Sequence, residues 1–373
     1  MPDQEAQEPT KGGQGAVSRR AIVGATVGGI GAATVVGVAA AAAWPETSSA
    51  SDTGGAGSAG GAATATTAPA ETGAQIDFTA KPGADWKARD PILPPRPAES
   101  VHTITITAKE VEGEIAPGVK QQLWTFDGLV PGPVYRGAIG DQFNFTLKNE
   151  GTLGLSIDFH MSKVAPNDKM RTIQPGESLE YPFVAKHAGI YMYHCGTPPV
   201  LHHIGTGMYG ATIIDPPDLA KVDHEFFFVQ SEFYTGPEGA PGDLDKMSKS
   251  AWDAVVFNGY VNQYQHAPIR VEPNQRIRVW VLDAGPSENS SFHVIGTIFD
   301  TVYKEGNYLL RPGTGQGGCQ ALDLQPAQGG FVEFSFDEAG LYPFVTHKFA
   351  NPPIGALGVF QAGDVDPAAA AGH

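Results

Sequence analysis

The sequence predicts an all-β protein of two tandem β-barrels, preceded by an export segment and a low-complexity linker. Gly (47 residues) and Pro (30 residues) are plentiful and only 17% of the 373 residues are charged, which suits turn-rich β structure better than helices. Residues 101–107 alternate between two faces with the period of a strand, and short runs of this kind recur between turn signals. The chain also contains an internal repeat, which predicts one fold used twice.

The repeat pairs short segments in one half of the chain with segments in the other half. The pairs are Phe126-Asp127-Gly128 with Phe257-Asn258-Gly259, Asp158-Phe159-His160 with Ser291-Phe292-His293, Ala188-Gly189-Ile190-Tyr191 with Ala339-Gly340-Leu341-Tyr342, and Gly210-Ala211 with Gly355-Ala356. We therefore expect a first barrel over residues 101–216, a second over residues 217–363, and a tail of residues 364–373 outside the fold.

Residues 1–45 indicate an export signal. Arg19-Arg20 stands directly before an apolar run that ends near Ala43, which is the order of a twin-arginine-type signal. The segment is either cleaved or kept as a membrane anchor, because the run is long enough to span a bilayer. Both alternatives predict a periplasmic, cell-surface or extracellular protein. Residues 46–100 are predicted to be a Ser/Thr/Ala/Gly-rich linker followed by an extended, Pro-rich lead-in.

Charge and cysteine content exclude some classes of protein. The formal net charge of −16 argues against a nucleic-acid partner, since phosphate binding needs clustered Lys and Arg. Two cysteines, Cys195 and Cys319, cannot supply a disulfide framework. A single Cys195–Cys319 bridge is the alternative to a stronger pattern around Cys195.

That pattern is His194-Cys195, followed by His203 and Met208. A cysteine thiolate, an imidazole and a weak thioether on one loop are the donors of a type 1, blue-copper electron-transfer site. Neighbours on an extended segment point to opposite faces, so Cys195 can face one metal while His194 faces a second. The covalent path between them would then carry electrons.

The second metal would have imidazole ligands. Asp158 and His160 lie two residues apart and share a face of their predicted strand. With His194 and His347, which follow matching halves of the repeat, His160 would make a mononuclear catalytic copper centre with one open position. A core role for His160 and a turn role for Asp158 are the alternatives.

These residues resemble the two-domain copper nitrite reductase and multicopper oxidase superfamily, built from cupredoxin-like Greek-key barrels. The resemblance spans about residues 101–362 and rests on residues 126–133, 157–160, 193–195, 203–208 and 346–348. It implies a homotrimer whose type 2 copper lies between subunits, held by His160 and His194 from one chain and His347 from its neighbour. It also makes Asp158 the catalytic proton donor to the bound substrate, nitrite.

Two positions depart from that family's pattern. Leu155 stands where the family has another type 1 histidine, which leaves Cys195, His203 and Met208 in the type 1 set. Either His202 substitutes as a ligand or the type 1 site is weakened or empty. Ile298 stands where we expect the family's second catalytic histidine, and His293, five residues earlier, is expected to support a ligand or belong to the core.

Three functions follow from these observations. The first is a copper enzyme that reduces nitrite to nitric oxide with electrons from an unknown donor. The second is a copper-binding or electron-transfer protein without that activity, which the Leu155 departure favours. A laccase-like oxidase is the least favoured, because its trinuclear cluster needs paired His-x-His motifs and the sequence has none.

Overall fold

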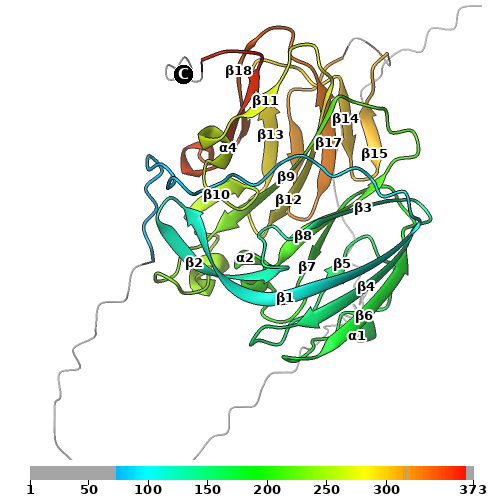
Figure 1. Ribbon diagram of the computed structural model, residues 1–373, viewed down its shortest axis with the longest axis vertical. Helices are drawn as coiled ribbons and strands as arrows, with labels where there is room; N and C mark the ends of the chain where they lie inside the picture. Colours follow the sequence, from blue (N-terminus) through cyan, green and yellow to red (C-terminus); the bar gives the residue numbers. More distant parts are fainter. Residues whose placement is uncertain (1–72, 314, 316, 367–373) are drawn as a thin grey trace, which may run out of the picture. The chain divides into compact units, whose positions relative to one another are not determined.

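The computed structural model describes residues 73–313, 315 and 317–366 (Figure 1). The predicted export signal, the first part of the linker and most of the tail lie outside these residues. Within the described part of the chain, no helix has both the length and the apolar character that crossing a bilayer requires. The all-β prediction is confirmed, because the described elements are mainly strands arranged in sheets.

The first half of the described chain contributes eight strands in two four-stranded sheets, with orders β2-β1-β4-β6 and β3-β8-β7-β5. The elements are β1 (Val101–Ala116), β2 (Val119–Phe126), β3 (Val134–Ala138), β4 (Gln142–Asn149), β5 (Asp158–Phe159), α1 (Pro166–Lys169), β6 (Ser178–Val184), β7 (Gly189–His194), α2 (Val200–Gly205) and β8 (Tyr209–Asp215). The predicted start of the first strand at Val101 matches β1.

The second half forms a six-stranded sheet, β10-β9-β12-β17-β14-β15, and a five-stranded sheet, β11-β19-β18-β13-β16. The strands are β9 (His224–Phe233), β10 (Ala254–Phe257), β11 (Ile269–Val271), β12 (Ile277–Gly285), β13 (Ser290–Val294), β14 (Thr301–Lys304), β15 (Asn307–Leu310), β16 (Leu322–Leu324), β17 (Gly329–Phe334), β18 (Gly340–Thr346) and β19 (Leu357–Ala362). The helices are α3 (Leu244–Ser248), α4 (Gln263–His266) and the 3-10 helix η1 (Pro352–Ile354).

The strand orders show the repeat that the sequence predicts. The order β2-β1-β4-β6 returns as β10-β9-β12-β17, and β3-β8-β7-β5 returns as β11-β19-β18-β13. Parallel pairing recurs at equivalent places, since β1 pairs parallel with β4 as β9 does with β12. The second half adds the β14–β15 hairpin and β16 at its sheet edges.

Asp127 and Asn258 illustrate why the paired sequence segments match. Both adopt positive φ, 57° and 55°, a conformation that Asp and Asn tolerate better than most residues. The side-chain Oδ1 of Asp127 accepts a hydrogen bond from Thr107 N at 2.7 Å, and Oδ1 of Asn258 accepts one from Val229 N at 2.8 Å. Each side chain therefore ties a turn to the first strand of its barrel.

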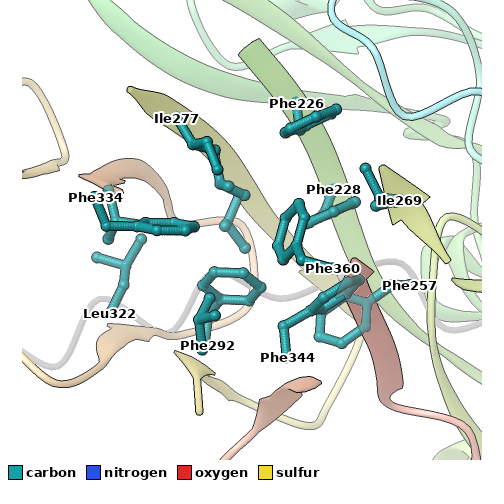
Figure 2. Packing of buried hydrophobic residues seen from close by; sticks show 14 of the residues in the cluster. Phe226, Phe228, Phe257, Ile269, Ile277, Phe292, Leu322, Phe334, Phe344 and Phe360 are labelled. Carbon is teal, nitrogen blue, oxygen red and sulfur yellow. The ribbon is translucent and has the colours of Figure 1, made fainter. Parts of the chain in front are cut away.

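Apolar side chains fill the space between the sheets of each half. In the second half, Phe228 stacks on Phe344 with ring centroids 4.7 Å apart, at the centre of the aromatic cluster shown in Figure 2. Burying one such side chain contributes about 1.5–3 kcal/mol. In the first half, Phe145, Phe159 and Tyr193 occupy the equivalent core, and Cys195 and Met208 belong to the same cluster.

A third apolar cluster joins the two halves. Ile190 and Met192 of β7 pack with residues of the six-stranded sheet, among them Trp280 and Phe331. The sheet that carries β5, β7 and β8 is therefore apolar on both faces, as expected for a layer between two cores. β7 belongs to this layer and ends at His194.

The Pro-rich lead-in has more defined contacts than an extended linker needs. Ile92 forms an isolated bridge with Phe226, and Leu93 N donates to Glu225 O at 2.9 Å. Arg89 donates to the carbonyl oxygens of Pro131 and Gly132. The segment thus contacts both halves of the fold, which its composition did not reveal.

Candidate metal centres

Two short strands bring together the groups of the first centre. Asp158 of β5 lies directly opposite His194 of β7 in an antiparallel pair, and His160 N donates to Met192 O at 3.1 Å. The pairing places side chains 34 and 36 residues apart in the sequence at one sheet edge, where local sequence patterns alone cannot place them.

The imidazoles of His160 and His194 point their Nε2 atoms at each other, 2.9 Å apart. Asp158 Oδ2 lies 3.9 Å from His194 Nε2. Possible ligand atoms of Asp158, His160 and His194 all lie within 4.8 Å of one another, and no other set of three His, Cys, Asp or Glu groups in the described residues is gathered this closely. One cation could contact all three groups.

The protonation states of the two imidazoles suit a metal. His194 Nδ1 lies 2.8 Å from the carbonyl oxygen of Cys195, so Nδ1 carries the proton and Nε2 keeps its lone pair. Partial desolvation at the sheet edge, together with the neighbouring His194, lowers the pKa of His160 and so favours the neutral ring. Neutral imidazole is the form that binds metal.

The second centre lies inside the first barrel. Cys195 is fully buried, and its sulfur accepts a hydrogen bond from Ser156 N at 3.5 Å. Burial raises the pKa of the thiol, so a bound cation would have to displace its proton. Cys195 N donates to Met208 O at 3.1 Å and Met208 N donates to His203 O at 3.0 Å, which holds the three donor residues together.

One ring nitrogen of His203 has no hydrogen-bond partner. Its side chain lies on α2, is 4% exposed, and packs at 4.8 Å against the ring of Trp124. Its Nδ1 is buried without a hydrogen-bond partner, an arrangement that normally costs free energy. Burial lowers the pKa of His203 to about 4, so the ring is neutral. A soft metal bound with the Cys195 and Met208 sulfurs would satisfy this nitrogen.

Comparisons with known proteins identify the family of the chain. The multicopper oxidase family profile matches residues 107–219. A copper nitrite reductase of known structure from Nitrosomonas europaea is 34% identical, with a TM-score of 0.65, and the match covers 72% of this chain and 96% of that one. The chain belongs to the superfamily of copper nitrite reductases and multicopper oxidases.

Curated relatives carry the same description. The copper-containing nitrite reductase of Neisseria gonorrhoeae is 37% identical over 252 residues, and a solved enzyme from Thermus scotoductus SA-01 is 27% identical with a TM-score of 0.65. The match covers 65% of this chain and 63% of the Neisseria protein, and 70% and 62% of the respective chains for the Thermus structure. Type 1 and type 2 copper are the cofactors of this superfamily, and the two donor sets described above suit them.

Leu155 and His202 are the positions where we expect this chain to depart from the type 1 site of the family it resembles. Leu155 is buried in the cluster that contains Cys195 and Met208. Its backbone N donates a hydrogen bond to Ile173 O, and its O accepts one from Ile173 N. His202 turns elsewhere, because its Nε2 lies 2.8 Å from Gly242 O and its ring packs on Trp124. The structure thus gives His202 a partner in the second half of the chain.

His347 does not join His160 and His194 within one chain. It follows β18 and lies exposed, with its ring 5.4 Å from His293 and 4.6 Å from Phe349. Ile298 is 58% exposed and offers no titratable group. We expected His293 to support a ligand or to belong to the core, and the structure places its imidazole next to that of His347.

Cys319 plays no part in either centre. Both cysteines are free, which rules out the Cys195–Cys319 bridge, and Cys319 Sγ donates to Ala321 O at 3.1 Å.

Sequence reasoning overlooked Ser156 and Trp124. Ser156 contacts the Cys195 sulfur through its backbone N, and Trp124 covers His202 and His203. The position of Ser156 next to Leu155 was the only available signal for its role.

Proposed function

We propose that this chain is a copper-dependent oxidoreductase that reduces nitrite to nitric oxide at the centre formed by His160 and His194. The observation that carries the proposal is the cluster of Asp158, His160 and His194, joined by one peptide bond to the buried thiol of Cys195. The names of the relatives support nitrite as the substrate.

The cluster needs a third ligand, and His347 of a second copy of the chain would supply it in a homotrimer. Two features support this arrangement. His160 is exposed at its sheet edge, and His347 is exposed beside the apolar ring of Phe349, which is 59% exposed. Each chain would then present His160 and His194 on one face and His347 on another, as a closed ring of identical subunits requires.

Copper bound between these imidazoles would supply Lewis acidity and a one-electron couple. Reduction of nitrite to nitric oxide consumes one electron and two protons and releases one water. Asp158 stands within 3.9 Å of His194 Nε2, where its carboxyl can donate a proton to a substrate oxygen. His293, next to His347, offers a second titratable group on the facing half of the site.

The electron would reach this centre from Cys195 through its peptide bond with His194. Cys195, His203 and Met208 would hold the type 1 copper, with Leu155 in place of the family's other histidine. The carbonyl oxygen of Cys195 also accepts from His194 Nδ1, so a second short path joins the two residues. The electron donor is a separate molecule that the sequence does not identify.

Export by a twin-arginine-type route is part of the proposal and rests on residues 1–45. That route would place the enzyme in the periplasm, on the cell surface or outside the cell, with the N-terminal segment as a possible anchor.

Leu155 supports a second candidate function. A copper-binding or electron-transfer protein without nitrite reductase activity would tolerate an incomplete type 1 site.

The deciding experiment is nitric oxide formation from nitrite by the copper-loaded chain, with a small artificial reductant as electron donor. We expect activity that disappears in His160→Gln. An exposed histidine far from the site, His187, provides the matched control, and His187→Gln should keep full activity. Full copper occupancy with no nitric oxide would reject the enzyme in favour of the second function.

A further inference from the structure

We propose that the Cys195 centre is a three-donor site selective for Cu(I), and that Leu155 makes it so. This inference rests on the proposal that copper is the metal of the protein. It makes the Cys195 centre one that favours the reduced ion and therefore passes electrons on to His194 slowly, rather than one that cycles freely.

The site offers two sulfurs and one nitrogen as metal ligands. They are Cys195 Sγ, Met208 Sδ and His203 Nδ1, and all three residues are at least 96% buried. Backbone hydrogen bonds from Cys195 to Met208 and from Met208 to His203 set their relative positions. His203 Nδ1 has no other partner, so it is free to bind.

The polar side chains near these donors have other partners in the described part of the chain. Ser156 Oγ lies 3.9 Å from Cys195 Sγ and accepts hydrogen bonds from Gly196 N and Thr197 Oγ1. Among the described residues, Cys195 belongs to no group of three gathered His, Cys, Asp or Glu side chains. His202 Nε2 is held by Gly242 O, and the ring packs against Trp124. Leu155, 1% exposed, is pinned by reciprocal backbone hydrogen bonds with Ile173, so its backbone cannot swing away to admit another group.

This donor set matches one oxidation state of copper better than the other. Cu(I) accepts two or three soft ligands such as thiolate and thioether, whereas Cu(II) favours more ligands and harder nitrogen or oxygen donors. Charge favours the same state. Cu(I) with the Cys195 thiolate is neutral, while Cu(II) would leave a net positive charge in an apolar core.

Binding is balanced by one proton. The Cys195 thiol loses its proton to solvent as Cu(I) enters, and no electron is exchanged. A later one-electron oxidation would produce the thiolate-bound Cu(II) that absorbs visible light intensely, and Leu155 is expected to oppose that step.

The test loads the full chain with Cu(I) without oxygen and then adds a one-electron outer-sphere oxidant. The background variant is His160→Gln, which silences the other centre. We expect one Cu(I) per chain that is lost in the added Cys195→Ser variant, and little visible or paramagnetic type 1 signal after mild oxidant. Introducing Leu155→His should produce an intense thiolate-to-Cu(II) band and its electron paramagnetic resonance signal.

A second variant guards against a misfolded Leu155→His protein. Leu155→Ala opens the same space, and added imidazole should then produce the thiolate-to-Cu(II) band. Leu179→Ala, which opens a space elsewhere in the same core, should show no band with imidazole.

Two results would overturn the inference. One is a full-intensity type 1 signal in the protein that keeps Leu155, and the other is failure of the Cys195 centre to take up Cu(I) at all. Nitric oxide formation at the His160 centre is measured separately, in the chain that retains His160, so the proposed function is judged by its own assay.

Discussion

His194 and Cys195 are neighbours in the chain, yet they serve opposite sides of one sheet. The Cys195 sulfur lies in the core of the first barrel, while the His194 imidazole meets His160 at the partly exposed edge. The carbonyl oxygen of Cys195 also fixes the His194 tautomer at 2.8 Å from Nδ1. One peptide unit therefore connects the two centres and orients a ligand of one of them.

Asp158→Asn should lower turnover without removing copper. The carboxyl lies in the cluster with His160 and His194, where we propose it as the general acid, and loss of a general acid typically costs about 10²–10⁴-fold in rate. Steady-state nitric oxide formation and copper content measured on the same sample provide the check. Asp168→Asn, an exposed acid paired with Lys169 on α1, is the control and should keep normal turnover. A fall in copper content equal to the fall in rate would assign Asp158 a ligand role instead.

Subunit complementation should reveal whether the site is shared. His160→Gln and His347→Gln chains are each expected to be inactive alone. In a trimer that contains both variants, one site in three draws both intact halves from different chains, so about a third of the activity should return. Coexpression with two distinguishable tags, followed by assay of the doubly tagged fraction, measures this. No recovery in a confirmed mixed trimer would contradict a site between subunits.

Arg278→Met should destabilise the second barrel. The guanidinium is 1% exposed and bonds to Glu333 Oε1 at 2.7 Å and to Glu225 Oε1 at 2.8 Å. Removing one partner of a buried ion pair typically costs about 3–5 kcal/mol. We expect the lower part of that range, because Arg136 still pairs with Glu225 and Arg276 with Glu333. Urea unfolding monitored by fluorescence should show the loss. Lys120→Met breaks an exposed pair with Glu112, and we expect a change of about 1 kcal/mol or less. Equal effects of the two variants would refute the role of burial.

Glu232 should make the folded state less stable as the pH rises. Burial raises the pKa of its carboxyl from 4.5 to about 7, against hydrogen bonds from Tyr234 and from the backbone of Ser287 and Glu288 that lower it. Because the folded chain holds this proton more tightly than the unfolded chain, the contribution is complete below pH 4.5. It declines by about 1.4 kcal/mol per pH unit up to about pH 7 and is absent above that.

Glu232→Gln removes this titration and should flatten the dependence of unfolding free energy on pH between 4.5 and 7. Chemical unfolding at several pH values compares the variant with the parent and with Glu112→Gln, an exposed carboxyl. An unchanged slope in Glu232→Gln would show that the hydrogen bonds outweigh burial.

The strands, the repeat and the ligand types were open to prediction from the sequence, because each depends on local order. The period-two alternation from Val101 marks β1, and the matching turns at Asp127 and Asn258 mark equivalent corners of the two halves. Cys195, His203 and Met208 are also close together in the sequence, so these three ligands stay near one another wherever their segment lies in the fold.

Other features were decided by contacts between distant segments. The pairing of β5 with β7 brought Asp158 opposite His194, the carbonyl of Gly242 engaged His202, and the packing of β13 beside β18 placed His293 next to His347. A residue's own sequence neighbours do not encode such partners, since strand register and side-chain direction are settled only when both barrels have packed.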